Sequence, residues 1–142
     1  MSNLLVQNIK HTNNTTAQTI DTSGRTTALL NNDTTYRSDS GAVTQNMVQG
    51  LAKSFIRCPD NGASITDSFN ITSLTDNSTG RTTVIIANNM ANANYSIAEC
   101  TDENVRESWC DDLTTGQYDY DTYDGSNYTD IGKMSQTFGD LA

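Results

Sequence analysis

The clearest pattern in the chain is a polar, turn-forming stretch that borders directly on an apolar one. Upstream of it, Phe69, Ile71 and Ser73 alternate with polar neighbours, which is the period-2 pattern of a half-buried strand. Residues 75–80 then supply Asp, Asn, Ser and Gly, which bend a chain, and residues 81–87 return with β-branched side chains that suit a pleated surface. The sequence therefore predicts a β-hairpin here.

Further strand-like segments recur about every 8–12 residues, separated by turn signals such as the Pro and Gly of residues 58–62. The predicted strands are residues 51–58, a segment around Tyr95 and Ile97, residues 105–109, a segment around Tyr118 and Tyr120, and residues 133–138. Short strands at this spacing predict an all-β fold, an antiparallel β-sandwich.

The first 46 residues contain few large apolar side chains and no helical period. Residues 4–9 and 28–30 are predicted as short strands on either side of a Thr/Asn-rich tract. The stretch TSGRTTALL at 22–30 nearly repeats the later TGRTTVII, and two hairpins with the same turn chemistry explain the likeness. Because such a segment cannot close a core of its own, we expect an extended N-terminal arm at 1–46 and a β-sandwich module at 47–142.

The amino-acid composition indicates a small hydrophobic core. Fewer than one residue in five is Leu, Ile, Val or Phe, which is little for a compact monomer, so we expect copies of the chain to complete one another in a homo-oligomer or a larger assembly. The net charge of −9 argues against nucleic acid as a partner. With no export signal and no apolar run long enough to span a bilayer, we expect no membrane insertion.

The sequence offers no recognisable catalytic or metal-binding set. His11 is the sole histidine and lies in the polar N-terminal segment. Cys58, Cys100 and Cys110 lack the spacing of a zinc site or of a disulfide framework, and they are predicted to be buried small apolar residues. The acidic segment 119–130 does not follow the register of a calcium loop, because its glycine falls one position late. We therefore expect no enzyme activity, no metal and no cofactor.

The same acidic segment carries a cluster of tyrosines. Tyr118 and Tyr120 alternate with aspartates, so one face of the strand is predicted to be aromatic and the other acidic. Together with Tyr123 and Tyr128 they are candidate residues for surface or receptor contact, because tyrosine supplies amphipathic contact area at low entropic cost. A solvated acidic face and a stacking platform for sugars are the alternative interpretations.

Parts of the chain resemble proteins of tailed-phage virion appendages, particularly those of marine phages. The leader MSNLLVQNIKHTNNTTAQTIDTSGR resembles the N-terminal leader of such proteins, and DSFNITSLTDNSTG (67–80) followed by MANANY (90–95) is similar to a module at the distal end of tail fibres. The closing FGDLA (138–142) is similar to the end of that module. The resemblance implies a β-sandwich subunit, trimeric in most such proteins, with its N-terminus anchored to the virion.

We accordingly expect a structural protein of a tailed-phage virion, a tail fibre or tail-appendage subunit that is assembled in the host cytoplasm. Its partners would be further copies of itself, other virion proteins, and a glycan or protein of the host surface. Leu4, Leu5, Val6 and Ile9 are the predicted virion-anchoring residues. A capsid-surface decoration or head-fibre protein and, from another class, a carbohydrate-binding module are the alternatives.

Overall fold

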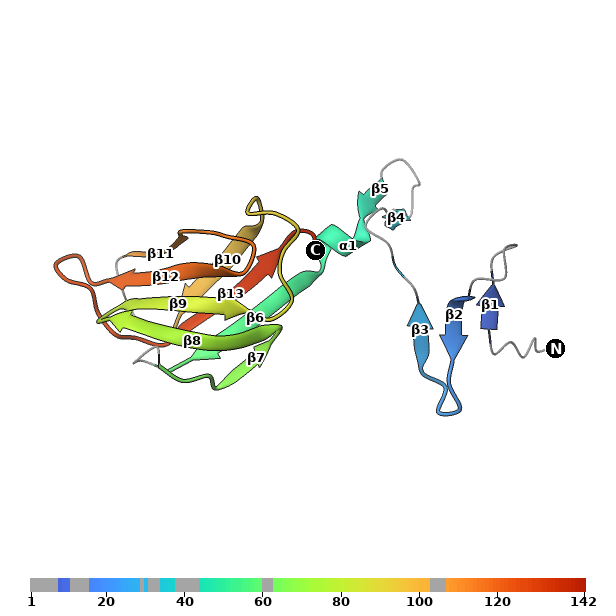
Figure 1. Cartoon of the computed structure of the whole chain (residues 1–142), viewed down its shortest axis with the longest axis horizontal. Coiled ribbons are helices and arrows are strands. Elements are labelled where there is room, and N and C mark those ends of the chain that lie inside the picture. Colours follow the sequence, from blue (N-terminus) through green and yellow to red (C-terminus); the bar gives the residue numbers. More distant parts are fainter. Residues whose placement is uncertain are drawn as a thin grey trace.

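A computed structural model describes residues 8–10, 16–28, 30, 34–37, 44–59, 63–102 and 107–142. The described chain is almost entirely β-structure, and every pair of neighbouring strands is antiparallel. Two four-stranded sheets pack face to face, as Figure 1 shows. The predicted all-β class with packed antiparallel sheets is therefore confirmed.

The first sheet has the strand order β10-β13-β6-β7 and consists of β6 (Ala52–Cys58), β7 (Asp67–Phe69), β10 (Ser96–Thr101) and β13 (Lys133–Phe138). The second sheet has the order β11-β12-β9-β8 and consists of β8 (Ile71–Ser78), β9 (Arg81–Ile86), β11 (Glu107–Asp111) and β12 (Gln117–Tyr123). The chain thus enters the sandwich through β6, a central strand that is hydrogen-bonded on one side to β13 and on the other to β7.

The segments before the sandwich form small elements of their own. They are β1 (Asn8–Lys10), β2 (Thr16–Ile20) and β3 (Thr26–Ala28) in a three-stranded sheet, β4 (Thr35–Arg37) and β5 (Thr44–Asn46) in a two-stranded sheet, and the single-turn helix α1 (Met47–Gly50). Strands β1 to β3 contact mainly one another, and Figure 1 draws them apart from the sandwich. The strand predicted at 28–30 lies instead at 26–28.

Several predicted N-terminal features cannot be compared with the structure. Leu4, Leu5, Val6 and His11 lie outside the described residues. Ile9 lies in β1, where the backbone alone is described, and it pairs there with Gln18 of β2. Anchoring through these side chains remains a prediction.

The alternating segment around Phe69 is two strands, not the single strand that the pattern predicted. Asn70 between them has a φ of 57°, a left-handed conformation that asparagine tolerates better than most residues. Its Nδ2 donates to the carbonyl oxygen of Lys53, and its Oδ1 accepts from the backbone N–H of Asn88. Because β7 belongs to the first sheet and β8 to the second, the chain crosses between the sheets at this asparagine.

The predicted hairpin is confirmed, with a tighter turn than expected. Strand β8 runs on to Ser78 past a bulge, and only Thr79 and Gly80 form the turn to β9. Gly80 has a φ of 71°, and Gly24, in the hairpin between β2 and β3, has a φ of 77°. The repeated sequence element therefore marks two hairpins, each of which needs a glycine in the left-handed conformation.

The core between the sheets combines apolar packing with hydroxyl hydrogen bonds. The Tyr118 hydroxyl lies 2.6 Å from Ser135 Oγ, and the Tyr120 hydroxyl donates to the carbonyl oxygen of Cys100 at 2.7 Å. Burial raises the pKa of both tyrosines, so the hydroxyls stay protonated and able to donate. The buried apolar residues of this cluster are Ile56, Val84, Ile86, Met90, Tyr95, Tyr118 and Tyr120.

A buried ammonium group joins the two sheets. Lys133 of β13 is only 1% exposed, and its Nζ donates to the carbonyl oxygens of Gly80 and Tyr120 and to Thr82 Oγ1 at 2.9–3.1 Å. These three bonds satisfy all three donors of the ammonium. The carbonyl oxygen of Gly80 also accepts from the backbone N–H of Thr122, so the hairpin turn is fixed from both sheets.

Replacing Gly80 with alanine should therefore destabilise the sandwich strongly. The added Cβ would lie 2.6 Å from the backbone nitrogen of Thr129 and 2.7 Å from the carbonyl oxygen of Thr122. Because of this clash and of the left-handed φ, we expect Gly80→Ala to lower the free energy of unfolding, measured by urea denaturation, by at least about 2 kcal/mol. Gly116→Ala is the matched control, because its Cβ would meet only the side chain of Asn89, and equal losses in both variants would contradict this account.

Candidate functional site

The outer face of the second sheet brings charged and aromatic residues together from three strands. The strand register places Asp121 of β12 between Arg81 of β9 and Trp109 of β11. Along β12, residues with odd numbers point outward, so Asp119, Asp121 and Tyr123 share this face. We call it the aromatic–acidic face, and its residues are Arg81, Trp109, Asp111, Asp119, Asp121, Tyr123 and Tyr128.

An ion pair with unequal burial lies at the middle of this face. Arg81 Nε lies 3.0 Å from Asp121 Oδ2, and the aspartate side chain is 1% exposed whereas that of the arginine is 42% exposed. Burial raises the pKa of Asp121, and the Arg81 guanidinium opposes that rise. The carboxylate therefore depends on this arginine to stay charged inside the protein.

Three aromatic rings lie together on this face, and one of them contacts the arginine of the ion pair. The ring of Tyr128 lies 6.0 Å from that of Trp109 and 5.7 Å from that of Tyr123, measured between centroids, and the Arg81 guanidinium lies 5.3 Å from the Tyr128 centroid. Tyr128 is 39% exposed and Tyr123 is half-buried. Aromatic rings beside an arginine and carboxylates can bind polar ligands through stacking and charged hydrogen bonds.

The prediction that four tyrosines form a surface cluster is wrong for two of them. Tyr118 and Tyr120 are fully buried and point into the core, where their hydroxyls bond to Ser135 and Cys100. The alternation along β12 correctly separated an aromatic from an acidic face, but the aromatic face is the inner one. Of the predicted contact residues, the structure leaves Tyr123 and Tyr128 on the outside.

Neither the place of Trp109 on this face nor the grouping of aspartates across strands was predicted from the sequence. Asp111 pairs directly with Asp119 in the β11–β12 ladder, and Asp112 follows β11 at once. One carboxylate oxygen from each of these three aspartates lies within 4.8 Å of the others. The sequence does show two aspartates immediately before a hairpin loop and alternating tyrosines and aspartates after it. Which of these aspartates meet, however, depends on the register between β11 and β12, and the sequence does not give that register.

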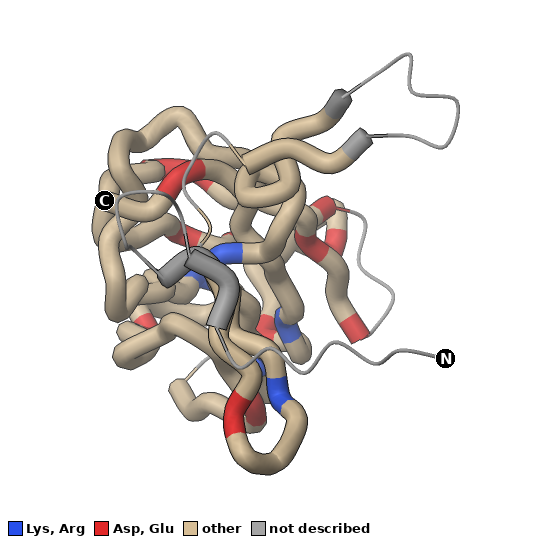
Figure 2. Tube along the Cα trace, turned by 90° about the vertical axis from the view of Figure 1, so that its right-hand side faces the viewer, with Lys and Arg blue, Asp and Glu red and all other residues tan. Residues whose placement is uncertain are grey.

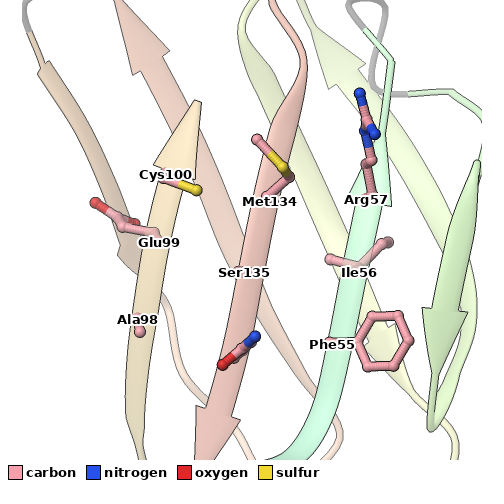
Figure 3. A pocket seen from close by; sticks show the side chains of 9 residues that line it. Phe55, Ile56, Arg57, Ala98, Glu99, Cys100, Met134 and Ser135 are labelled. Carbon is pink, nitrogen blue, oxygen red and sulfur yellow. The ribbon is translucent and has the colours of Figure 1, made fainter. Parts of the chain in front are cut away.

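The outer face of the first sheet is apolar by comparison. A shallow hollow of about 400 Å³ crosses strands β6, β13 and β10 there, and Figure 3 shows side chains of Phe55, Met134 and Cys100 around it. The rings of Phe55 and Phe69 stack with centroids 6.3 Å apart, and Phe69 is 56% exposed. We call this surface the apolar face, and its residues are Phe55, Arg57, Phe69, Ala98, Cys100, Met134 and the polar Gln136, which lies between Phe55 and Ala98.

The cysteines are all free, as the sequence predicted, but they differ in burial. Cys58 is buried, Cys110 is half-buried against the core and Cys100 is exposed, so the prediction of burial is wrong for Cys100. Burial raises the pKa of Cys58 and of Cys110, which keeps both thiols protonated.

Figure 2 shows acidic positions on several parts of the tube and few basic ones, in keeping with the net charge of −9.

Removing the arginine of the central ion pair should have a pH-dependent cost. In Arg81→Gln the buried Asp121 carboxylate loses its charged partner, and we expect the free energy of unfolding at pH 7 to fall by about 2 kcal/mol. Because the folded-state pKa of Asp121 already lies above its ordinary value, the variant raises it further, and the folded protein then binds more protons than the unfolded chain. The free energy of unfolding of the variant should therefore fall as the pH rises from the ordinary pKa of an aspartate through the raised pKa of Asp121. The loss of stability relative to the wild type should be smaller near pH 4 than at pH 7.

Thermal or urea denaturation at several pH values measures this effect. Arg25→Gln is the matched control, since Arg25 is 81% exposed in its ion pair with Asp21, and such pairs contribute little. A deficit of Arg81→Gln that does not change with pH would show that Asp121 does not titrate in the way described.

Within the described ranges, no helix has the length and apolar character needed to cross a membrane. Comparisons with models of protein families, with curated proteins and with solved structures found no match.

Proposed function

We propose that this chain is a structural and binding protein of a tailed-phage virion, a subunit of a tail fibre or tail appendage. In this proposal residues 1–46 dock on other virion proteins and the sandwich is presented outward, where it contacts the host surface. The role is one of assembly and binding without catalysis. The protein would be assembled in the host cytoplasm and reside in the particle.

The observation that carries this proposal is the separate packing of the N-terminal strands. Strands β1 to β3 contact mainly one another and, as drawn in Figure 1, stand apart from the sandwich. All three residues of β3 are exposed, and the three residues of β2 whose burial is described, Gln18, Thr19 and Ile20, are half-buried. A polar three-stranded sheet with little core of its own gains stability by docking on another protein.

The apolar face supports association between copies. Phe69 is 56% exposed on an edge strand beside Phe55, and the hollow next to them is lined largely by apolar atoms. Large exposed aromatic residues that gather on one sheet face are typical of an interaction surface. We propose that a second copy covers this face, and that the assembly is a homotrimer.

Two alternatives remain beside this proposal. A capsid-surface decoration or head-fibre protein would share the sandwich and the docking segment. A carbohydrate-binding module is favoured by one specific observation, the contact of the exposed Tyr128 ring with Trp109, Tyr123 and Arg81, because rings beside charged groups suit sugar faces and hydroxyls.

If the proposal is correct, the protein will be recovered in stoichiometric amount from purified particles of the virus that encodes it. A chain that lacks residues 1–46 should keep the β-sheet spectrum of the sandwich in circular dichroism but should be absent from those particles. Electron microscopy of labelled particles then distinguishes tail from capsid. Absence of the full-length chain from particles, together with sugar binding that Trp109→Ala abolishes, would favour the carbohydrate-binding module instead.

The full-length protein should sediment as a trimer at low micromolar concentration. Phe69→Ser removes an exposed ring from the proposed contact, and we expect each contact to weaken at least about tenfold, which corresponds to roughly 1.4 kcal/mol. Tyr128→Ser is the matched control, because Tyr128 is an exposed ring that follows β12 and lies beside Tyr123 and Trp109 of the other sheet. A wild-type monomer in sedimentation equilibrium would refute self-association, and equal effects of the two variants would refute the apolar face as the contact.

A further inference from the structure

The single turn of α1 connects the N-terminal segments to the sandwich, and its own apolar packing is slight. None of its residues is buried, and Met47 within it and Leu51 just after it are 36% and 52% exposed. A helix of one turn is not stable by itself in water, because its few hydrogen bonds do not offset the entropy lost in ordering it. Polar contacts with the rest of the protein therefore have to fix its position.

Lys53 supplies the main contact of this kind. The alternation along β6 places its side chain on the outer face of the sheet, with Phe55 and Arg57, yet it is only 6% exposed. Its Nζ donates to the carbonyl oxygen of Val48 and, at 2.7 Å, to that of Leu51. These carbonyls lie at the C-terminal end of α1, where helical carbonyl oxygens need acceptor partners from outside the helix. The turn thus covers the ammonium, and the ammonium holds the turn.

Two further hydrogen bonds connect the same turn to elements on each side. The side-chain amide of Gln49 donates to Asp140 Oδ2 at 3.4 Å, at the end of the chain that follows β13. The backbone N–H of Met47 donates to the carbonyl oxygen of Thr34, which precedes β4. Burial lowers the pKa of Lys53, and the nearby Asp140 carboxylate opposes that change. Figure 1 accordingly draws α1 between β5 and the C-terminal end of the sandwich.

The remaining hydrogen bonds of α1 shape the turn without attaching it to the sheet. Asn46 Oδ1 accepts from the backbone N–H of Gln49 at 2.8 Å, and the N–H of Leu51 donates to the carbonyl oxygen of Val48 at 3.2 Å. Both bonds lie within residues 46–51, so they would persist if the turn swung away about the extended backbone of Leu51. Attachment to the sandwich therefore depends on Lys53, with the longer Gln49–Asp140 bond beside it.

We propose that Lys53 locks α1 against the sandwich, so that β4, β5 and α1 move with the sandwich as one rigid unit. Hydrogen bonds from a charged donor stabilise more than those from a neutral one, and here they join two elements that share little apolar contact. One side chain then sets the direction in which the N-terminal segment leaves the domain. The lock does not depend on what that segment binds, so it can be tested apart from the virion proposal.

Backbone ¹⁵N relaxation of the full chain measures this rigidity. In the wild type, the amides of residues 45–51 should have the same order parameters as those of β6, about 0.85. Lys53→Met keeps most of the length of the side chain and removes its charge and its donors. In this variant we expect the order parameters of residues 45–51 to fall below about 0.6, while those of β9 and β12 stay unchanged.

Two further variants separate the lock from other effects. Arg57→Met removes a cation from the same strand and the same face, but Arg57 is exposed, so residues 45–51 should stay as rigid as in the wild type. Gln49→Ala removes only the longer bond to Asp140 and should lower the order parameters less than Lys53→Met does.

The lock is overturned if residues 45–51 of the wild type already move independently of the sandwich, or if Lys53→Met leaves their order parameters unchanged. A loss in Gln49→Ala as large as that in Lys53→Met would assign the attachment to the Gln49–Asp140 bond instead. Unfolding of the sandwich in Lys53→Met would also overturn the proposal, because Lys53 would then support the sheet itself and not the joint.

Discussion

The burial of one ammonium group is the constraint on which the arrangement of the sandwich depends. Lys133 belongs to the first sheet, yet its three hydrogen bonds all end on the second sheet and on the hairpin turn that precedes β9. A buried cation is tolerated only if each donor finds an acceptor, which fixes the distance and the relative position of β13, β9 and β12. The hairpin turn at Gly80 is held by the same interaction, because its carbonyl oxygen accepts from both Lys133 and Thr122.

The polar core changes how the composition should be interpreted. Few aliphatic residues are available, and the sandwich fills its interior with tyrosine rings whose hydroxyls bond to Ser135 and to the carbonyl oxygen of Cys100. Ser54 and Thr137 likewise pair within the core at 2.7 Å. One copy can therefore close its own interior despite its low aliphatic content. Association between copies no longer follows from a shortage of apolar residues; it is proposed instead from the exposed ring of Phe69 and its stacking on Phe55.

Local patterns in the sequence predicted much of the fold, but they did not predict which strands meet. The bounds of β13 and the hairpin at Gly80 followed from β-branched runs and turn residues, which act over a few positions. The crossing at Asn70 was missed because period-2 alternation continues through it. Likewise, the burial of Tyr118 and the convergence of Asp111 on Asp119 depend on packing and register, which only the assembled sheets define.

The central position of β6 has a mechanical consequence. The N-terminal segments connect to the sandwich through this strand, which is bonded to a neighbour on each side and lies antiparallel to the final strand β13. Tension transmitted along the chain from that direction cannot peel off an edge; it must shear two ladders of hydrogen bonds at the same time. The N-terminal segments are thus attached through a strand that is hydrogen-bonded on both sides.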